Sequence, residues 1–266
     1  MAFAVAIPSR ALPEHRDLAF WMKRTLEELA GLRANPSGDA VHDFRVALRR
    51  CRSLAAAVAE IDPHPDWKEL RDCARKVFRS MGELRDAQIM EAWLRELCTQ
   101  DDVGKSALME SLKREQEAAQ VKALHLSGKF DETRWRELAR TLRARLRKIP
   151  PDGDAARCLA LERLEEAKEL HRRALRTEKA RPWHELRIGL KRFRYTLELL
   201  VPSLHIKWID SLKRVQDVLG DIHDLDMLLE KFSESQAASN PELAKDLRVR
   251  IAEIRKIGRA SCRERV

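Results

Sequence analysis

Two segments of the chain carry the same row of basic and imidazole side chains at helical spacing. The segments read VHDFRVALRRCR at residues 41–52 and WHELRIGLKRFR at residues 183–194. Because a helix turns about 100° per residue, each row falls within an arc of about 80°, opposite an apolar face. The rows consist of His42, Arg45, Arg49 and Arg52 in the first copy and of His184, Arg187, Lys191 and Arg194 in the second.

The composition of the two rows favours an anion-binding role over a plain solvated surface. A solvated helix face usually mixes acids and bases to gain i,i+4 ion pairs, whereas neither row contains an acid. Like charges at this spacing repel by about 0.2–0.5 kcal/mol per pair, so a repeated row suggests a ligand that offsets the repulsion. Arg and Lys bind phosphate oxygens through charge-assisted hydrogen bonds. A line of cations about 5–6 Å apart suits a linear chain of phosphates better than one small anion.

Nucleic acid is the main alternative ligand. Proteins that bind single strands stack bases on aromatic rings, and the rows contain none, although Trp183 and Tyr195 flank the second row. No helix-turn-helix or zinc-finger pattern is found. We therefore expect inorganic polyphosphate as the partner and disfavour nucleic acid. An acidic protein partner and an enzyme that acts on phosphoanhydride bonds stay open as alternatives.

The histidines of the rows fit a role as hydrogen-bond donors to phosphate better than a role as metal ligands. His42 and His184 each precede the first Arg of their row by one turn, with no Cys or Glu beside them on the same face, which makes a poor zinc site. We expect no metal and no cofactor. A bound polyanion should raise the pKa of the imidazoles, so binding should tighten as the pH falls through about 7.

The apolar residues recur at helical spacing nearly everywhere, without strand-like alternation, and this predicts an all-α protein. Asp66 and Glu69 have the spacing of a capping box at the start of the third helix. Prolines and glycines place the other helix ends. The expected helices span residues 14–34, 39–61, 66–98, 102–126, 131–148, 155–177, 182–201, 204–232 and 241–257.

The chain also repeats itself beyond the basic rows. The linker PPDGD at residues 150–154 separates a first half, 10–149, from a second half, 154–256. The repeat predicts two related halves of about four helices each, arranged as paired bundles.

The second long helix of each half contributes matching residues. Gly82 corresponds to Gly220, for which we expect a close approach of two helices, and Asp86 corresponds to Asp224. The three aspartates of the second half could suggest a magnesium cluster for phosphoryl transfer. Because the first half keeps only one of them, helix caps or salt bridges are the better interpretation of Asp221, Asp224 and Asp226.

The bulk composition indicates a basic, intracellular protein. Charged residues make up 36% of the 266 residues, and the net charge is +9, so an acidic partner is expected. The five cysteines lack metal-ligand spacing, and no secretory signal or stretch of 18 apolar residues is found, which favours the cytoplasm. The end, IGRASCRERV at residues 257–266, resembles the translation of a common sequencing adapter. We interpret it as a non-native tail.

The twin segments HDFRVALRRCR and HELRIGLKRFRYTLELL, followed by LGDIHDLDML, resemble the CHAD domain family over residues 10–256. The resemblance implies an all-α fold of two pseudo-two-fold-related four-helix bundles around a central basic cavity. It also implies polyphosphate binding on both rows and recruitment to polyphosphate granules. It extends the site to Arg75, Arg79 and Lys213 on the second long helix of each half. The chain departs from the pattern at Asp217, which stands where the first half has Arg79. No CYTH triphosphatase motif is found, and we infer no catalysis.

Overall fold

The computed structural model describes residues 18–98, 105–177, 179–234 and 241–265, and within them every regular element is a helix. This confirms the predicted all-α class. The helices are α1 (Leu18–Ala34), α2 (Gly38–Ile61), α3 (Pro65–Cys73), α4 (Arg75–Leu97), α5 (Lys105–Gly128), α6 (Glu132–Leu146), α7 (Asp154–Leu175), α8 (Ala180–Leu200), α9 (Pro202–Glu234) and α10 (Pro241–Arg265).

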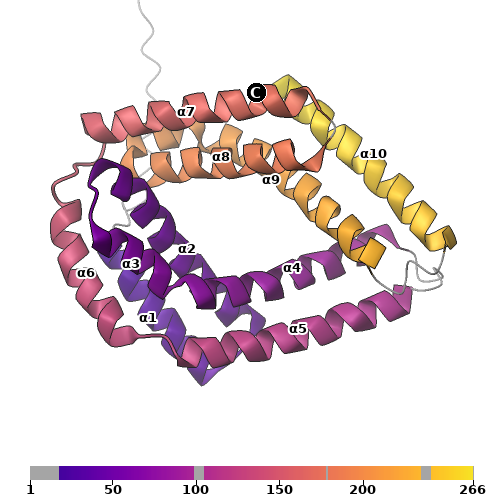
Figure 1. Ribbon diagram of the computed structural model, residues 1–266, viewed down its shortest axis with the longest axis horizontal. Helices are drawn as coiled ribbons and strands as arrows, with labels where there is room; N and C mark the ends of the chain where they lie inside the picture. Colours follow the sequence, from indigo (N-terminus) through magenta and orange to yellow (C-terminus); the bar gives the residue numbers. More distant parts are fainter. Residues whose placement is uncertain (1–17, 99–104, 178, 235–240, 266) are drawn as a thin grey trace, which may run out of the picture.

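The helices are arranged as a ring of antiparallel pairs (Figure 1). The pairs α1–α2, α4–α5, α7–α8 and α9–α10 pack along their lengths. The α4–α5 and α9–α10 pairs form two arms that meet where α4 contacts α9, and at the opposite end α2 contacts α8. The two helices that carry the basic rows are therefore neighbours, although they lie about 140 residues apart in the chain.

Two hydrophobic cores hold the ring together, one at each end. The larger core contains Trp67, Trp135 and Trp183, all with 0–1% of their surface exposed, and draws on helices of both halves. The smaller core joins the arms through side chains such as Leu94 of α4 and Phe232 of α9. Since each described core mixes the two halves, the division into two four-helix bundles stays a prediction.

The linker between the halves is a tight turn that is attached to the second half. Asp152 has a positive φ of 60°, and its backbone N–H donates to the carbonyl of Leu200 over 2.9 Å. The Asp152 carboxylate also accepts a hydrogen bond from Ser203. The predicted boundary thus coincides with a fixed corner between α6 and α7.

The expected helix 66–98 is wrong in two respects. It is divided at Ala74 into α3 and α4, and Ala74 is fully buried where they meet. The capping box is also wrong, because α3 begins at Pro65 and its N-cap is His64, whose Nδ1 accepts from the N–H of Asp66 over 3.4 Å. The Glu69 carboxylate is instead bound by Arg134 of α6 through two hydrogen bonds of 2.6 Å.

The segment that we interpreted as a foreign tail is packed into the fold. The predicted helix end at 257 is wrong, since α10 continues to Arg265. Cys262 is 1% exposed and belongs to the larger core, and the Arg259 guanidinium lies 5.5 Å from the centre of the Trp183 ring. Whether the segment is native stays a prediction.

The matched glycines do not mark a close approach of helices. A Cβ added to Gly82 or Gly220 would meet no atom within 4 Å, so our interpretation of these positions is wrong. By contrast, a Cβ at Gly189 would lie 2.5 Å from Leu170 Cδ1, and one at Gly258 would lie 3.2 Å from Ile222 Cγ1. Glycine inside a helix costs about 1 kcal/mol relative to alanine, and no packing contact explains that cost at Gly82 and Gly220.

Candidate functional site

Helix α2 is fixed by a buried apolar face, and this turns its basic row away from the core. The Ser37 side chain caps the helix by accepting from the N–H of Ala40 over 3.1 Å, which satisfies one of the free N–H groups of the first turn. Phe44, Leu48 and Cys51 are fully buried. On the other side, three basic side chains are half-buried, whereas His42 is exposed. The half-buried members are Arg45, Arg49 and Arg52.

Helix α8 has the same construction. Trp183, Leu186 and Leu197 are almost completely buried against the larger core. The whole basic row of α8 is half-buried, namely His184, Arg187, Lys191 and Arg194.

The two rows converge, which the electrostatics of Lys191 shows most clearly. Burial, together with repulsion from Arg187 on its own helix and from Arg49 and Arg45 on α2, lowers the pKa of Lys191 to about 8. Burial and Arg49 likewise lower the pKa of Arg45. The protein therefore concentrates like charges from both halves in one partly shielded space.

An ion pair between the two helices keeps them together beside these charges. Arg50 of α2 pairs with Glu198 of α8, and its guanidinium lies 5.6 Å from the centre of the Tyr195 ring. Since Arg50 is adjacent to Arg49 in the sequence, the pair also fixes the position of the α2 row relative to α8.

Two matched aspartates face the converging rows from the opposite helices. Burial raises the pKa of Asp86 on α4, while Arg45, Arg187 and Lys191 act to lower it. Burial also raises the pKa of Asp224 on α9, and Asp86 adds to this rise while Arg187 opposes it. Four helices thus contribute charged groups to the same space.

The three aspartates of the second half have different surroundings. Asp226 pairs with Arg255 of α10, Oδ1 to Nε, over 2.8 Å, as the salt-bridge interpretation predicted. Asp221 lies at the surface, where partial shielding of its carboxyl from solvent and the nearby Asp217 and Glu96 raise its pKa. Among the described residues, no group of three His, Cys, Asp or Glu side chains is placed to hold a metal ion.

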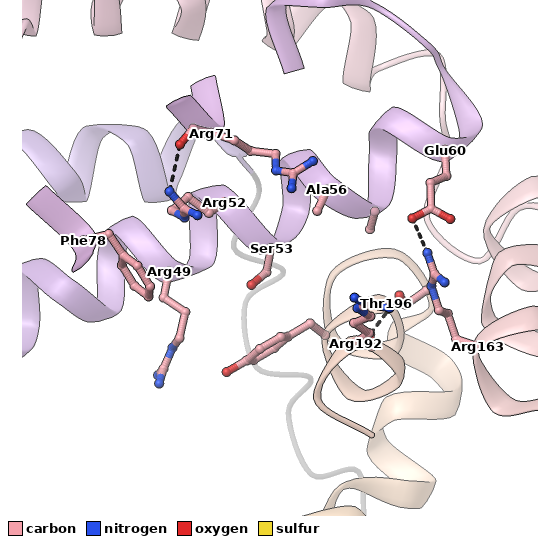
Figure 2. A pocket seen from close by; sticks show the side chains of 12 residues that line it. Arg49, Arg52, Ser53, Ala56, Glu60, Arg71, Phe78, Arg163, Arg192 and Thr196 are labelled. Carbon is pink, nitrogen blue, oxygen red and sulfur yellow. Dashed lines mark hydrogen bonds and ion pairs between the residues drawn. The ribbon is translucent and has the colours of Figure 1, made fainter. Parts of the chain in front are cut away.

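A cavity of about 610 Å³ opens beside the C-terminal ends of the two rows (Figure 2). Arg49 and Arg52 line it from α2, Phe78 from α4, and Tyr195 from α8. Sequence reasoning missed three further arginines of its wall, which come from α3, α7 and α8 and are Arg71, Arg163 and Arg192. Figure 2 shows Arg163 paired with Glu60, and Glu166 pairs with both Arg163 and Arg192, over 2.8 and 2.9 Å.

Aromatic rings hold arginines of both rows, a feature that the row sequences do not show. The guanidiniums of Arg45 and Arg52 lie 5.1 and 4.9 Å from the centre of the Phe78 ring. The Arg194 guanidinium lies 5.1 Å from the centre of the Tyr195 ring. Such cation–π contacts attract each guanidinium to a ring face, and this limits how far the crowded charges can spread apart.

Comparison with known proteins identifies the family of the chain. The family model of the CHAD domain matches residues 18–233. The chain belongs to the CHAD domain family. No curated protein sequence matches it.

Two solved structures share the CHAD fold of this chain. The CHAD domain from the plant Ricinus communis is 22% identical, with a TM-score of 0.66, and the alignment covers 96% of this chain and 92% of the plant chain. PptA from Streptomyces chartreusis is 19% identical, with a TM-score of 0.64, over 92% of this chain and 93% of that chain.

The site residues that the CHAD resemblance added are on the periphery. Arg75 and Arg79 are exposed in the first turns of α4, and both act to lower the pKa of Arg52, behind burial and Arg71. Lys213 is exposed on α9, and none of the interactions found in the described residues joins it or His42 to the converging rows.

His184 of this CHAD chain has a partner that the sequence did not indicate. Its Nδ1 lies 3.2 Å from Nδ1 of His223 on α9, and both line a cavity of about 230 Å³. Burial lowers the pKa of His223 to about 4, helped by Arg187 and His184. Without a bound polyanion, therefore, the pKa of these imidazoles is lowered rather than raised.

None of the described helices is both long and apolar enough to span a bilayer.

Proposed function

We propose that this CHAD chain binds inorganic polyphosphate between the basic rows of α2 and α8. The observation that carries the proposal is the convergence of the rows, which lowers the pKa of Lys191 to about 8. Crowded, partly buried cations are costly without a counter-charge. A polyanion that lies along both rows offsets this cost over its whole length.

Unused hydrogen-bond donors support a phosphate ligand. The Nε atoms of four arginines, two from each row, are shielded from solvent and have no hydrogen-bond partner among the described residues. They belong to Arg45, Arg49, Arg187 and Arg194. Buried donors are normally paired, and phosphate oxygens would supply acceptors along both helices.

The protein is proposed to act as a binding module and to be recruited in this way to polyphosphate granules in the cytoplasm. Catalysis is no part of the proposal. An enzyme that acts on phosphoanhydrides would shorten or extend polyphosphate during incubation with Mg²⁺, so the chain length on a gel separates the two functions.

A charge-reversal experiment tests the proposal. The double variant Arg49→Glu with Lys191→Glu should abolish binding of fluorescent polyphosphate and keep the helical circular dichroism of the parent. The matched control reverses two exposed bases elsewhere, Lys113→Glu with Arg140→Glu, and so changes the net charge equally. Binding by the row variant that equals binding by the control would reject the site.

Salt and competitor RNA complete the test. Binding driven by counterion release weakens steeply as salt rises, so affinity that stays flat over a tenfold rise in salt contradicts the electrostatic account. Unlabelled polyphosphate should displace the labelled chain at a lower phosphate concentration than RNA does. The reverse order would favour a nucleic-acid binder.

A further inference from the structure

Gly82 and Gly220 occupy equivalent places in the two halves, and both border open space. No atom lies within 4 Å of the position that a Cβ would take at either residue. Both glycines are nevertheless half-buried, whereas Gly31 of α1, which also has free space around it, is exposed. Gly82 and Gly220 are therefore less exposed to solvent than Gly31.

In the first half, Gly82 is placed along α4 between two parts of the candidate site. Phe78, Gly82 and Asp86 follow one another at four-residue spacing along α4 and so share one face of the helix. Phe78 lines the 610 Å³ cavity, and Asp86 interacts with Arg45 and Arg187. Gly82 lies between them, one turn from each.

In the second half, Gly220 has the same relation to the charged groups. It precedes Asp224 by one turn of α9, and Asp224 interacts with Arg187, Lys191 and Asp86. The missing side chains of both glycines therefore face the space into which the two rows converge.

The arrangement of α4 and α9 explains why this space stays open. Their contact lies in the smaller core, through residues such as Met90 and Leu94 of α4 and Leu225 of α9. Both glycines precede these core residues along their helices. From the contact, the two helices diverge toward their N-termini, where α9 packs beside α8 and α4 contacts α2 (Figure 1).

We propose that Gly82 and Gly220 keep open a passage for the phosphate chain along the basic rows. An unbranched phosphate chain can pass close to a glycine backbone, and a side chain at either position would obstruct it. This inference rests on the proposed function.

Leucine at the two glycines tests the inference, because it fills the space without changing the charge. The variants are Gly82→Leu, Gly220→Leu and the double variant, and Gly31→Leu is the matched control on an outer surface. Leucine has the better helix propensity, so all of them should melt at or above the temperature of the parent. Polyphosphate affinity should fall more than tenfold in the double variant and stay within twofold of the parent in the control.

Alanine at both positions adds a graded measurement. The double Gly→Ala variant should lose less affinity than the double Gly→Leu variant, because a methyl group obstructs less of the passage. Parent-like affinity of a folded double Gly→Leu variant would overturn the passage while leaving the binding function intact. If the parent itself binds no polyphosphate, the proposed function and the passage fall together.

Discussion

The imidazoles of His184 on α8 and His223 on α9 face each other, with their Nδ1 atoms 3.2 Å apart and their ring centres 4.6 Å apart. At this distance one Nδ1 can donate to the other only if one of them carries a proton and the other does not. Burial lowers the pKa of both histidines, and Arg187 and Lys191 add to the effect. The pair is therefore largely uncharged at neutral pH in the free protein.

Polyphosphate binding should tighten on acidification below pH 7, and part of this gain should come from the histidine pair. A bound polyanion favours the charged imidazoles, so protons are taken up on binding until the pH reaches the pKa of the free protein, about 4 for His223. The double variant His184→Gln with His223→Gln should flatten the dependence. Protonation of Asp86 and Asp224 accounts for the pH dependence that remains in the double variant. The control is His125→Gln, which replaces an exposed histidine. An unchanged pH profile in the double variant contradicts this role.

Lys191 should make binding weaken at alkaline pH. Its pKa is lowered to about 8 in the free protein, and a bound polyanion should restore it toward the ordinary value. Binding then requires uptake of a proton above about pH 8, so affinity should fall by up to tenfold per pH unit. Lys191→Arg keeps the charge at all these pH values and should remove the decline. Isothermal titration calorimetry between pH 7 and 10 measures the affinity of the parent and of Lys191→Arg. The same decline in both proteins would show that Lys191 is not its cause.

Asp86→Asn and Asp224→Asn should tighten polyphosphate binding. Each carboxylate competes with phosphate for Arg187 and repels the ligand. An interaction of about 1 kcal/mol between partly screened charges corresponds to roughly fivefold in affinity. The amide keeps the shape of the side chain, so the fold should persist. Weaker binding by both variants would show that the carboxylates take part in holding the ligand, for example through a cation.

Phe78→Leu should weaken binding through loss of positioning. The ring attracts the guanidiniums of Arg45 and Arg52, and partly exposed cation–π contacts contribute about 0.5–1 kcal/mol each. Loss of both corresponds to about fivefold to thirtyfold in affinity. Phe78→Tyr keeps an aromatic face and should bind like the parent. Equal loss in the tyrosine and leucine variants would point to packing instead.

Removal of residues 257–266 should destabilise the protein. The deletion takes Cys262 from the larger core and Arg259 from the Trp183 ring, so the free energy of unfolding should fall by about 1–3 kcal/mol. Arg259→Gln keeps Cys262 in the larger core and should cost less. Urea denaturation of the three proteins measures the difference. An unchanged midpoint after truncation would mean that the packing of this segment contributes nothing to stability.

Several features of the fold and site were accessible from local sequence signals. The linker at 150–154 marked a turn between helices because proline restricts the backbone and glycine permits conformations that end a helix, wherever they occur. The division at Ala74 escaped prediction, since the helical periodicity passes through it without a proline or glycine. Glu69 was misread as a capping residue because its real partner, Arg134, lies 65 residues away.

The amino-acid sequence by itself determined that the chain is helical, that it repeats, and that each repeat has a basic row opposite an apolar face, since helix periodicity depends only on neighbours along the chain. Only the tertiary structure decided that the two rows converge and that Phe78, Asp86, His223 and Asp224 join them. It also decided that Gly82 and Gly220 border open space. These features depend on which faces of distant helices pack together, and burial in the two shared cores decides that.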